Sequence, residues 1–215
     1  YDLLEEAGAD IRPVTQLERR RRLEAVVAGA RDALGTSELV HAESWAELAE
    51  LRAHARERRV EGLMLKRRGA PYQVGRRRGD WWKWKIEPLT VDAVLIYAQA
   101  GSGRRANLFT DYTFAVWDDG GLVPIAKAYS GLDDKEIAEL DRWIRRHTIE
   151  RFGPVRSVTP EHVFEIAFEG INPSPRHKSG VALRFPRIKR WRHDLTIKDA
   201  EQLSDVKRLL PEEGT

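Results

Sequence analysis

Tryptophan and lysine alternate in the segment Trp-Trp-Lys-Trp-Lys at residues 81–85. Successive side chains of a β-strand point to opposite faces of its sheet. A strand here therefore places Lys83 and Lys85 on one face and Trp82 and Trp84 on the other. The tryptophans can anchor the strand on a core while the two cations share one surface. We predict an amphipathic strand over residues 73–86, after a turn-rich segment.

A second strand is predicted over residues 60–66, the short apolar run that Glu61 opens. If the two strands are neighbours, one carboxylate and two lysines converge on one site. A carboxylate suits a divalent metal ion and lysines suit phosphates, a combination typical of nucleotide chemistry. Two plainer interpretations stay open: Glu61 as a charge at a strand edge, and Lys83 and Lys85 as the solvated face of an amphipathic strand.

The first part of the chain also carries two capping boxes, each a Ser or Thr followed by Glu three residues later. They predict helices over residues 16–28 and 44–58. A change of composition and Pro88, which cannot continue a central strand, place a domain boundary near that proline. We expect this first domain to be an antiparallel sheet covered by helices.

Short strands separated by turns dominate the remainder of the chain. They are predicted over residues 91–98, 112–117, 163–168 and 181–185, with a hairpin turn over 118–121 and a helix over 133–150. Five or so strands with one helix after the third fit a small OB-type barrel. The predicted fold class is therefore α+β, with domains at residues 1–88 and 89–205 and a tail at 206–215.

Positive charge is concentrated in two segments of a chain whose formal net charge is only +3. Residues 64–86 contain eight Lys or Arg and one acid, and residues 171–192 contain seven Lys or Arg and no acid. The remainder of the chain is therefore acidic overall. Such asymmetry is typical of a protein that binds a polyanion, because phosphate contacts drive nucleic-acid affinity. Two solvated turns are the plainer interpretation.

Composition excludes several classes of protein. The chain has no cysteine, which rules out disulfides and thiolate metal sites. No run approaches the roughly 18 apolar residues of a membrane span, and the six histidines show no zinc-ligand spacing. The chain starts without methionine, at Tyr1, so we expect a piece of something longer.

Four segments together resemble the ATP-dependent DNA ligases. Residues 61–66 (EGLMLK) and 81–85 (WWKWK) resemble the fourth and fifth motifs of that family. Residues 1–12 resemble the segment after its third motif, and residues 183–194 (LRFPRIKRWRHD) resemble its sixth. The resemblance implies the end of a nucleotidyltransferase domain followed by an OB-fold domain, in an enzyme that uses ATP and Mg²⁺ or Mn²⁺ to seal nicked double-stranded DNA.

The resemblance also implies roles for individual residues. Glu61 would help to hold the metal ion, and Lys83 and Lys85 would contact the α-phosphate of the nucleotide. Tyr1 would pack on adenine, and Arg184 and Arg187 would meet the β- and γ-phosphates. The side chains expected to contact DNA are Arg76, Arg77, Arg78, Arg176, Lys178, Arg190 and Arg192.

The family's nucleophile is the lysine of a KxDG motif, and these residues contain no such motif. The motif order places that lysine upstream, so we expect the partner of this chain to be the preceding half of the same enzyme. The chain alone would then be unable to attach AMP to itself. A monomer is expected, in the cytoplasm with the nucleoid if the source is bacterial and otherwise in the nucleus.

Two other functions stay open at this point. One is a non-catalytic OB-type module whose basic strands serve nucleic-acid affinity alone. The other is an RNA ligase or a capping-type nucleotidyltransferase, which shares the logic of the fourth and fifth motifs. The RFPR sequence at residues 184–187 favours the DNA ligases.

Overall fold

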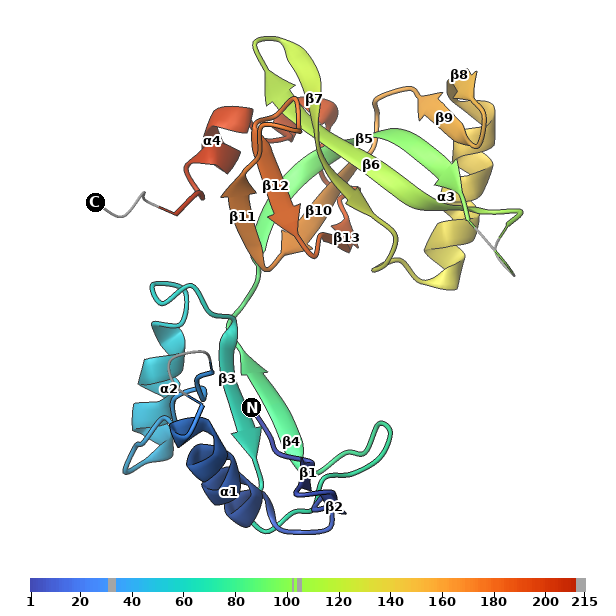
Figure 1. Cartoon of the computed structure of the whole chain (residues 1–215). Coiled ribbons are helices and arrows are strands. Elements are labelled where there is room, and N and C mark those ends of the chain that lie inside the picture. The colour runs from blue at the N-terminus through green and yellow to red at the C-terminus, as the bar shows by residue number, and fades with distance from the viewer. Residues whose placement is uncertain (31–33, 102, 104–105, 212–215) are drawn as a thin grey trace. The chain divides into compact units, whose positions relative to one another are not determined.

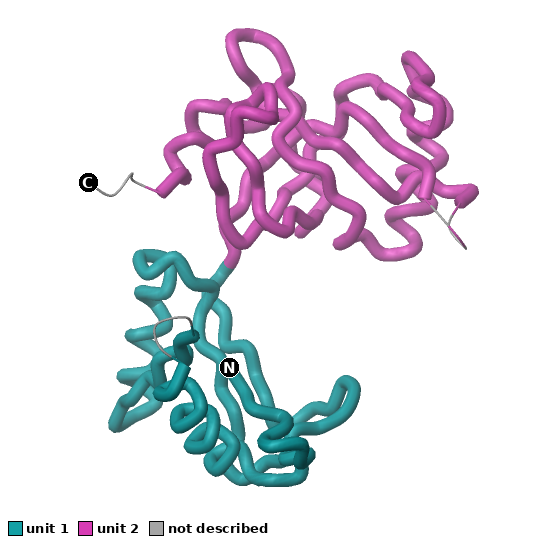
Figure 2. The backbone as a smooth tube through the Cα atoms, in the orientation of Figure 1, with its two compact units in different colours: residues 1–87 teal, residues 88–215 magenta. Residues whose placement is uncertain are grey.

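The computed structural model describes residues 1–30, 34–101, 103 and 106–211. They form two compact units, residues 1–87 (unit 1) and residues 88–215 (unit 2), shown in different colours in Figure 2. The predicted domain boundary near Pro88 lies at the start of unit 2. None of the helices in the described part of the chain is long and apolar enough to cross a membrane.

Unit 1 places two helices beside a two-stranded sheet (Figure 1). The helices are α1 (Gln16–Ala28) and α2 (Trp45–Ala53), and the short hairpin of β1 (Glu5–Glu6) and β2 (Ala9–Asp10) precedes them. Thr15 and Ser44 cap the two helices, each accepting a hydrogen bond from the backbone N–H three residues on. The prediction of α1 is confirmed at both ends.

Helix α2 is shorter than the predicted span of 44–58. The chain turns after Ala53, and Arg59 adopts a positive φ of 57°. The backbone N–H of Val60 then bonds to the carbonyl of Ala55. This turn reverses the chain and delivers it into the following strand, and the helical sequence pattern does not reveal it.

The sheet of unit 1 pairs β3 (Gly62–Lys66) with β4 (Trp81–Lys85) in antiparallel register. The strand predicted over residues 73–86 is therefore much shorter than expected. Residues 71–80 form a loop instead, in which Gly75 and Gly79 have φ values of 76° and 101°. Such left-handed conformations interrupt a strand and are readily adopted by glycine.

A buried ion pair fixes the start of the chain to α1. The Arg19 side chain is fully buried, and its guanidinium donates to the Asp2 carboxylate at 2.9 and 3.0 Å. It also donates to the side chain of Gln16 and to the carbonyls of Val14 and Ala70. These contacts satisfy the buried charge and hold the residues around Asp2 in place.

Unit 2 is built around a curled antiparallel sheet whose strands run in the order β13-β10-β5-β6-β7. The long β5 (Leu89–Ala100) pairs with β6 (Phe109–Asp118) along one edge. On the other edge its first half pairs with β10 (Val163–Phe168) and its second half with β9 (Val155–Val158). The remaining elements are β7 (Gly121–Ala128), α3 (Asp134–Arg146), β8 (Thr148–Phe152), β11 (Gly170–Pro173), β12 (Val181–Arg184), β13 (Arg187–Trp191), the 3₁₀ turn η3 (Ile197–Asp199) and α4 (Leu203–Lys207).

The two ends of this sheet approach each other where β7 ends and β13 begins. The backbone N–H of Ile188 donates to the carbonyl of Ser130 at 2.9 Å. Gly131 has a φ of 116°, and a Cβ atom there would lie 1.7 Å from the Ile188 carbonyl oxygen. Only glycine permits this approach, which gives the predicted OB-type barrel its curl.

Unit 2 differs most from the prediction in three places. The helix expected to reach residue 150 ends at Arg146, because Thr148 begins β8 and pairs with β9. Residues 187–191, for which no strand is predicted, form β13. The expected tail from residue 206 starts inside α4, where Val206 is buried against the core, and residues 212–215 lie outside the described part.

Glu201 makes the stability of unit 2 depend on pH. Its carboxylate accepts the backbone N–H of Asp92 at 2.8 Å. Burial is the main reason why the pKa of Glu201 rises from its usual 4.5 to about 7, and the Asp92 and Asp205 charges add to this. The stability that neutral Glu201 contributes is therefore fully present below about pH 4.5 and is lost as the pH rises through 7.

We expect Glu201→Gln to raise the free energy of unfolding at pH 8 by on the order of 1 kcal/mol, a value discounted for partial exposure. At pH 4.5 the variant should match the unsubstituted protein. Urea unfolding at several pH values measures both. Glu150→Gln, at an exposed position of β8, is the matched control. A gain of the same size at both pH values would contradict this assignment.

Candidate nucleotide site in unit 1

One face of the β3–β4 sheet carries the lysines that the sequence singles out. Lys85 lies opposite Gly62 and Lys83 lies opposite Met64 in the register. The Lys85 Nζ is 2.8 Å from a carboxylate oxygen of Glu61, so the predicted convergence of acid and lysine is confirmed for this pair. Lys83 is exposed and makes no ion pair with any residue that the structure describes. Its ammonium group is therefore available to an anion.

The same face continues toward the start of the chain. Lys66 lies opposite Trp81, with its Nζ 4.0 Å from the centre of the Trp81 ring. This Nζ also donates to the backbone carbonyl of Tyr1 at 2.9 Å, and it lies 5.7 Å from the centre of the Tyr1 ring. Burial lowers the pKa of Lys66. Tyr1 as a whole is 87% exposed, so its ring is accessible to a planar ligand.

Lys66 is the residue that the sequence interpretation missed. It follows Met64 by two residues, so the alternation that groups Lys83 with Lys85 also groups Lys66 with Met64. The paired register then brings it onto the lysine face, the name used below for Tyr1, Glu61, Lys66, Lys83 and Lys85. The signal was present in the motif EGLMLK, but only the strand pairing shows which face its lysine shares.

The tryptophans on the opposite face serve packing only in part. Trp84 meets the Trp45 ring edge-on at 6.0 Å, and the Arg52 guanidinium lies 4.9 Å from its ring centre. Trp82 is 46% exposed. The prediction that these rings face away from the lysines is confirmed. The described residues do not form a closed core over both rings, because Trp82 stays largely exposed.

The donor atoms of the lysine face suit a metal ion that travels with a nucleotide. Glu61 is its only carboxylate, and no group of three His, Cys, Asp or Glu able to hold a metal occurs among the residues that the structure describes. Mg²⁺ commonly keeps several waters and binds through one or two carboxylates together with substrate phosphates. The single carboxylate of Glu61 would fit this role if substrate phosphates and water supplied the other ligands.

The loop of residues 71–80 presents the predicted basic cluster. Arg76, Arg77 and Arg78 are exposed, and none makes an ion pair with a described residue. Arg77 also lines a pocket of about 300 Å³ together with Arg12 and Tyr72. The Arg12 side chain is already held by three hydrogen bonds to the Asp10 carboxylate, so the cluster supplies most of the available charge here.

The basic residues of β13, and Arg192 directly after it, are largely paired with carboxylates. Arg187 lies 3.0 Å from Glu169, and Arg190 lies 3.2 Å from Glu165. Arg192 is bound to both Asp92 and Asp194, at 2.7 and 2.8 Å, and only 16% of its side chain is exposed. Its expected DNA contact stays a prediction, but its guanidinium has little capacity left for a phosphate.

The remaining predicted residues of unit 2 lie around the β11–β12 hairpin. Arg176 and Lys178 are exposed in its loop, which the hydrogen bond between Ser174 and His177 at 2.7 Å braces. Arg184 ends β12, and its guanidinium lies 5.0 Å from the centre of the Phe185 ring. The predicted residues of unit 1 are thus gathered on one sheet and loop, and those of unit 2 on another hairpin and strand.

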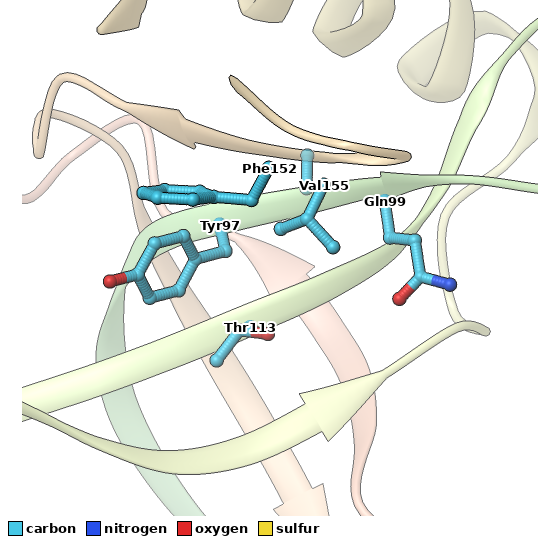
Figure 3. A pocket seen from close by; sticks show the side chains of 6 residues that line it. Tyr97, Gln99, Thr113, Phe152 and Val155 are labelled. Carbon is cyan, nitrogen blue, oxygen red and sulfur yellow. The ribbon is translucent and has the colours of Figure 1, made fainter. Parts of the chain in front are cut away.

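Unit 2 also has a shallow pocket that no sequence motif predicted. Figure 3 shows its labelled lining, in which the Phe152 and Tyr97 rings lie close together and Thr113 and Gln99 add polar groups. The pocket measures about 270 Å³ and its lining contains no ionisable group other than the tyrosine. We assign it no role in phosphate chemistry.

Comparison with known proteins places both units in one family. The family model described as "ATP dependent DNA ligase domain" matches residues 1–85, and "ATP dependent DNA ligase C terminal region" matches residues 105–195. A probable DNA ligase of Koribacter versatilis is 48% identical over 167 residues, which are 78% of this chain and 28% of that protein. A DNA ligase of Natronomonas pharaonis is 35% identical over 209 residues, 97% of this chain and 37% of that protein.

Solved structures show the same fold. The structure entitled "Pmar-Lig_PreS3" superposes with a TM-score of 0.64 at 21% identity, covering 84% of this chain and 40% of the other. A Lig E DNA ligase structure superposes with a TM-score of 0.60 at 19% identity, covering 89% and 61%. The chain spans between about a quarter and two-fifths of the two curated relatives. From the two family models and these relatives, the chain belongs to the ATP-dependent DNA ligases, of which it carries the C-terminal region.

Proposed function

We propose that the protein to which this chain belongs seals nicks in duplex DNA in three steps. A lysine Nζ outside this chain attacks the α-phosphorus of ATP, forming a P–N bond and releasing pyrophosphate. The AMP passes to the 5′-phosphate of the nick, which frees the lysine. The 3′-hydroxyl then attacks that phosphate, forms the phosphodiester and releases AMP. The observation that carries this proposal is the lysine face, with Glu61 and Lys85 2.8 Å apart beside the exposed Lys83.

Each residue of the lysine face has a distinct part in this scheme. Tyr1 stacks on adenine, and Lys66 holds the Tyr1 backbone in place. Lys83 and Lys85 stabilise the charge that develops on the α-phosphate during transfer. Glu61 would hold the divalent ion, which would neutralise phosphate charge. Lys85 is paired with Glu61, so both side chains would act at the same phosphate.

The two units divide the substrates between them in this proposal. Residues 1–88 complete a nucleotidyltransferase domain, and residues 89–205 form an OB-fold domain that binds DNA. Arg184 and Arg187 orient the pyrophosphate in the first step. The DNA contacts come from Arg76, Arg77, Arg78, Arg176, Lys178 and Arg190, with Arg192 bracing the strand. The enzyme acts as a monomer, in the compartment that holds the DNA.

A labelling experiment tests this function directly. Native protein is recovered from its source with an antibody to this chain, incubated with α-labelled ATP and magnesium, and separated on a denaturing gel. A labelled band well above 24.7 kDa, the mass of these residues, is expected, because the upstream lysine keeps the AMP. Labelling with γ-labelled ATP is the control and should be absent. An unlabelled band at 24.7 kDa would contradict the proposal.

The exposed basic clusters also fit one alternative function, a non-catalytic OB-type module that binds nucleic acid. That module would bind intact and nicked duplexes equally and would be indifferent to loss of Glu61. The RNA ligase or capping alternative receives no support from the two curated relatives above, which are named as DNA ligases. Sealing assays on matched DNA and RNA nicks separate these outcomes.

We expect a triple substitution of Arg76, Arg77 and Arg78 by alanine to weaken DNA binding in the full-length protein uniformly across sequences. Each lost phosphate contact lowers the slope of log affinity against log salt by about 0.9. The slope should therefore fall by about 2–3 if all three arginines contact phosphates. Fluorescence anisotropy across a salt series measures it, with Arg58→Ala as the control. An unchanged slope would remove the cluster from the DNA interface.

A further inference from the structure

Two arginines that no sequence motif singled out hold the end of β4. Arg52, in the last turn of α2, donates from its Nη1 to the backbone carbonyl of Lys85. Arg56, in the turn after α2, donates from its Nη2 to the carbonyl of Glu87 at 2.7 Å. We call these two residues the arginine clamp. Its contacts go to main-chain atoms, so they constrain the path of the backbone rather than a single rotamer.

Arg52 is also fixed from the side. Its guanidinium lies 4.9 Å from the centre of the Trp84 ring, a cation–π arrangement on the face opposite the lysines. Its Nε is buried and has no hydrogen-bond partner among the described residues. A buried donor without a partner is unfavourable, so the contacts with Lys85 and Trp84 have to offset that cost. The side chain is therefore committed to one position.

The clamped residues have their own constraints. The backbone N–H of Ile86, between the two clamped carbonyls, donates to the carbonyl of Glu61 at 3.0 Å. The side chain of Lys85 is bound to the Glu61 carboxylate. Glu87 precedes Pro88, and a residue before proline is restricted to extended conformations. Residues 85–87 are thus held from the helix side by arginines and from the strand side by Glu61.

We propose that Arg52 and Arg56 are positioning residues for the lysine face. By fixing the carbonyls on both sides of Ile86, the clamp sets the register in which the Lys85 Nζ meets Glu61. This inference rests on the proposed function, in which Lys85 acts on the transferring phosphate.

A role in packing alone makes a different prediction. If Arg52 only packs on Trp84 and Arg56 only stabilises the turn after α2, their loss lowers the stability of unit 1. The rate constant of the folded enzyme is then unchanged. If they position Lys85, the rate constant falls at temperatures where the variant is fully folded. A shift of about 1 Å in a catalytic group costs up to about a hundredfold in rate.

The test uses the full-length protein with the double substitution Arg52→Ala/Arg56→Ala, the single substitution Arg52→Lys, and Arg58→Ala as the matched control. Arg58 lies in the same turn and is exposed. Single-turnover sealing of a pre-adenylylated nick gives the rate constant and the half-saturating DNA concentration. Thermal unfolding reports stability, and hydrogen exchange at the Ile86 amide reports the backbone of the clamped segment.

We expect the double variant to lose about tenfold to a hundredfold in rate constant while its half-saturating DNA concentration changes little. In the double variant, hydrogen exchange at the Ile86 amide should be faster. Arg52→Lys should keep more of the rate constant than the double variant, and Arg58→Ala should behave like the unsubstituted protein. A rate constant within twofold of that protein, or a loss that simply follows the melting temperature, would overturn the clamp alone. If the unsubstituted protein seals no nick, the proposed function falls and the clamp's role with it.

Discussion

Replacing Lys83 by alanine in the full-length protein is expected to lower the rate constant for nick sealing by about 10²–10³-fold. Among the described residues, the ammonium group of Lys83 has no ion-pair partner, whereas Lys85 is paired with Glu61 and Lys66 donates to the Tyr1 carbonyl. The charge of Lys83 is therefore available to the transferring phosphate. Removing a fixed donor from a charge that develops in the transition state has an effect of this order. Single-turnover sealing at saturating ATP and DNA is the appropriate measurement.

Two further variants decide what the loss means. Lys83→Arg keeps the charge and should retain part of the rate, because a guanidinium also binds phosphate, although with different geometry. Lys198→Ala removes an exposed lysine of η3 and should leave the rate unchanged. Near-normal sealing by Lys83→Ala would remove this residue from the site and favour the solvated-face interpretation of the β4 lysines.

Gly131→Ala is expected to be the most damaging single substitution in unit 2, lowering the free energy of unfolding by about 3–4 kcal/mol. The left-handed backbone conformation accounts for about 1–2 kcal/mol of this. The rest arises because the new Cβ would lie 1.7 Å from the Ile188 carbonyl oxygen. Relieving that clash separates the ends of β7 and β13 and breaks the Ile188–Ser130 hydrogen bond.

Gly153→Ala is the control for backbone conformation alone. Gly153 also has a positive φ, 56°, but a Cβ there would have no atom within 4 Å. We expect a loss of about 1 kcal/mol for this variant. Urea unfolding of both proteins measures the difference. Equal losses would show that the closure at Ile188 contributes nothing beyond backbone strain.

Elements with a local signal were predicted most accurately from the sequence. Helix α1 was placed correctly at both ends because Thr15 caps it and helical periodicity stops at Gly29. Strand β10 was also placed correctly, because five of its six residues are apolar and the sheet buries those five. The pairing of Glu61 with Lys85 followed from strand alternation once the two strands were taken as neighbours.

Strand β13 shows why other elements could not be found in this way. Its buried residues are Ile188 and Trp191, three apart, because the register shifts between Glu165 and Ile166 of β10. A bulge removes the two-residue period on which strand prediction depends. Cross-strand ion pairs from Glu165 to Lys189 and Arg190 stabilise the strand, and they appear in the sequence only as a charged run.

The prediction of the candidate site from the sequence was incomplete for a related reason. Lys66 could be assigned to the lysine face only with the β3–β4 register known, and the arginine clamp only with α2 packed beside β4. Arg52 lies 33 residues before the carbonyl that it binds, so no local pattern links them. Sequence motifs identify groups that share a short segment, whereas tertiary packing decides which distant residues orient them.

Strand β5 has a consequence for how unit 2 can vary in length. The first half of β5 pairs with β10, which belongs to the closed part of the barrel. The second half pairs with β9 and so holds the β8–β9 hairpin at the side of the barrel. We expect residues inserted at the Phe152–Val155 tip of that hairpin to leave the closure at Ile188 intact, because β5 and β6 are paired along their length. The tip of this hairpin is therefore the place where we expect extra residues to be tolerated, whereas the segment around Gly131 leaves no room for them.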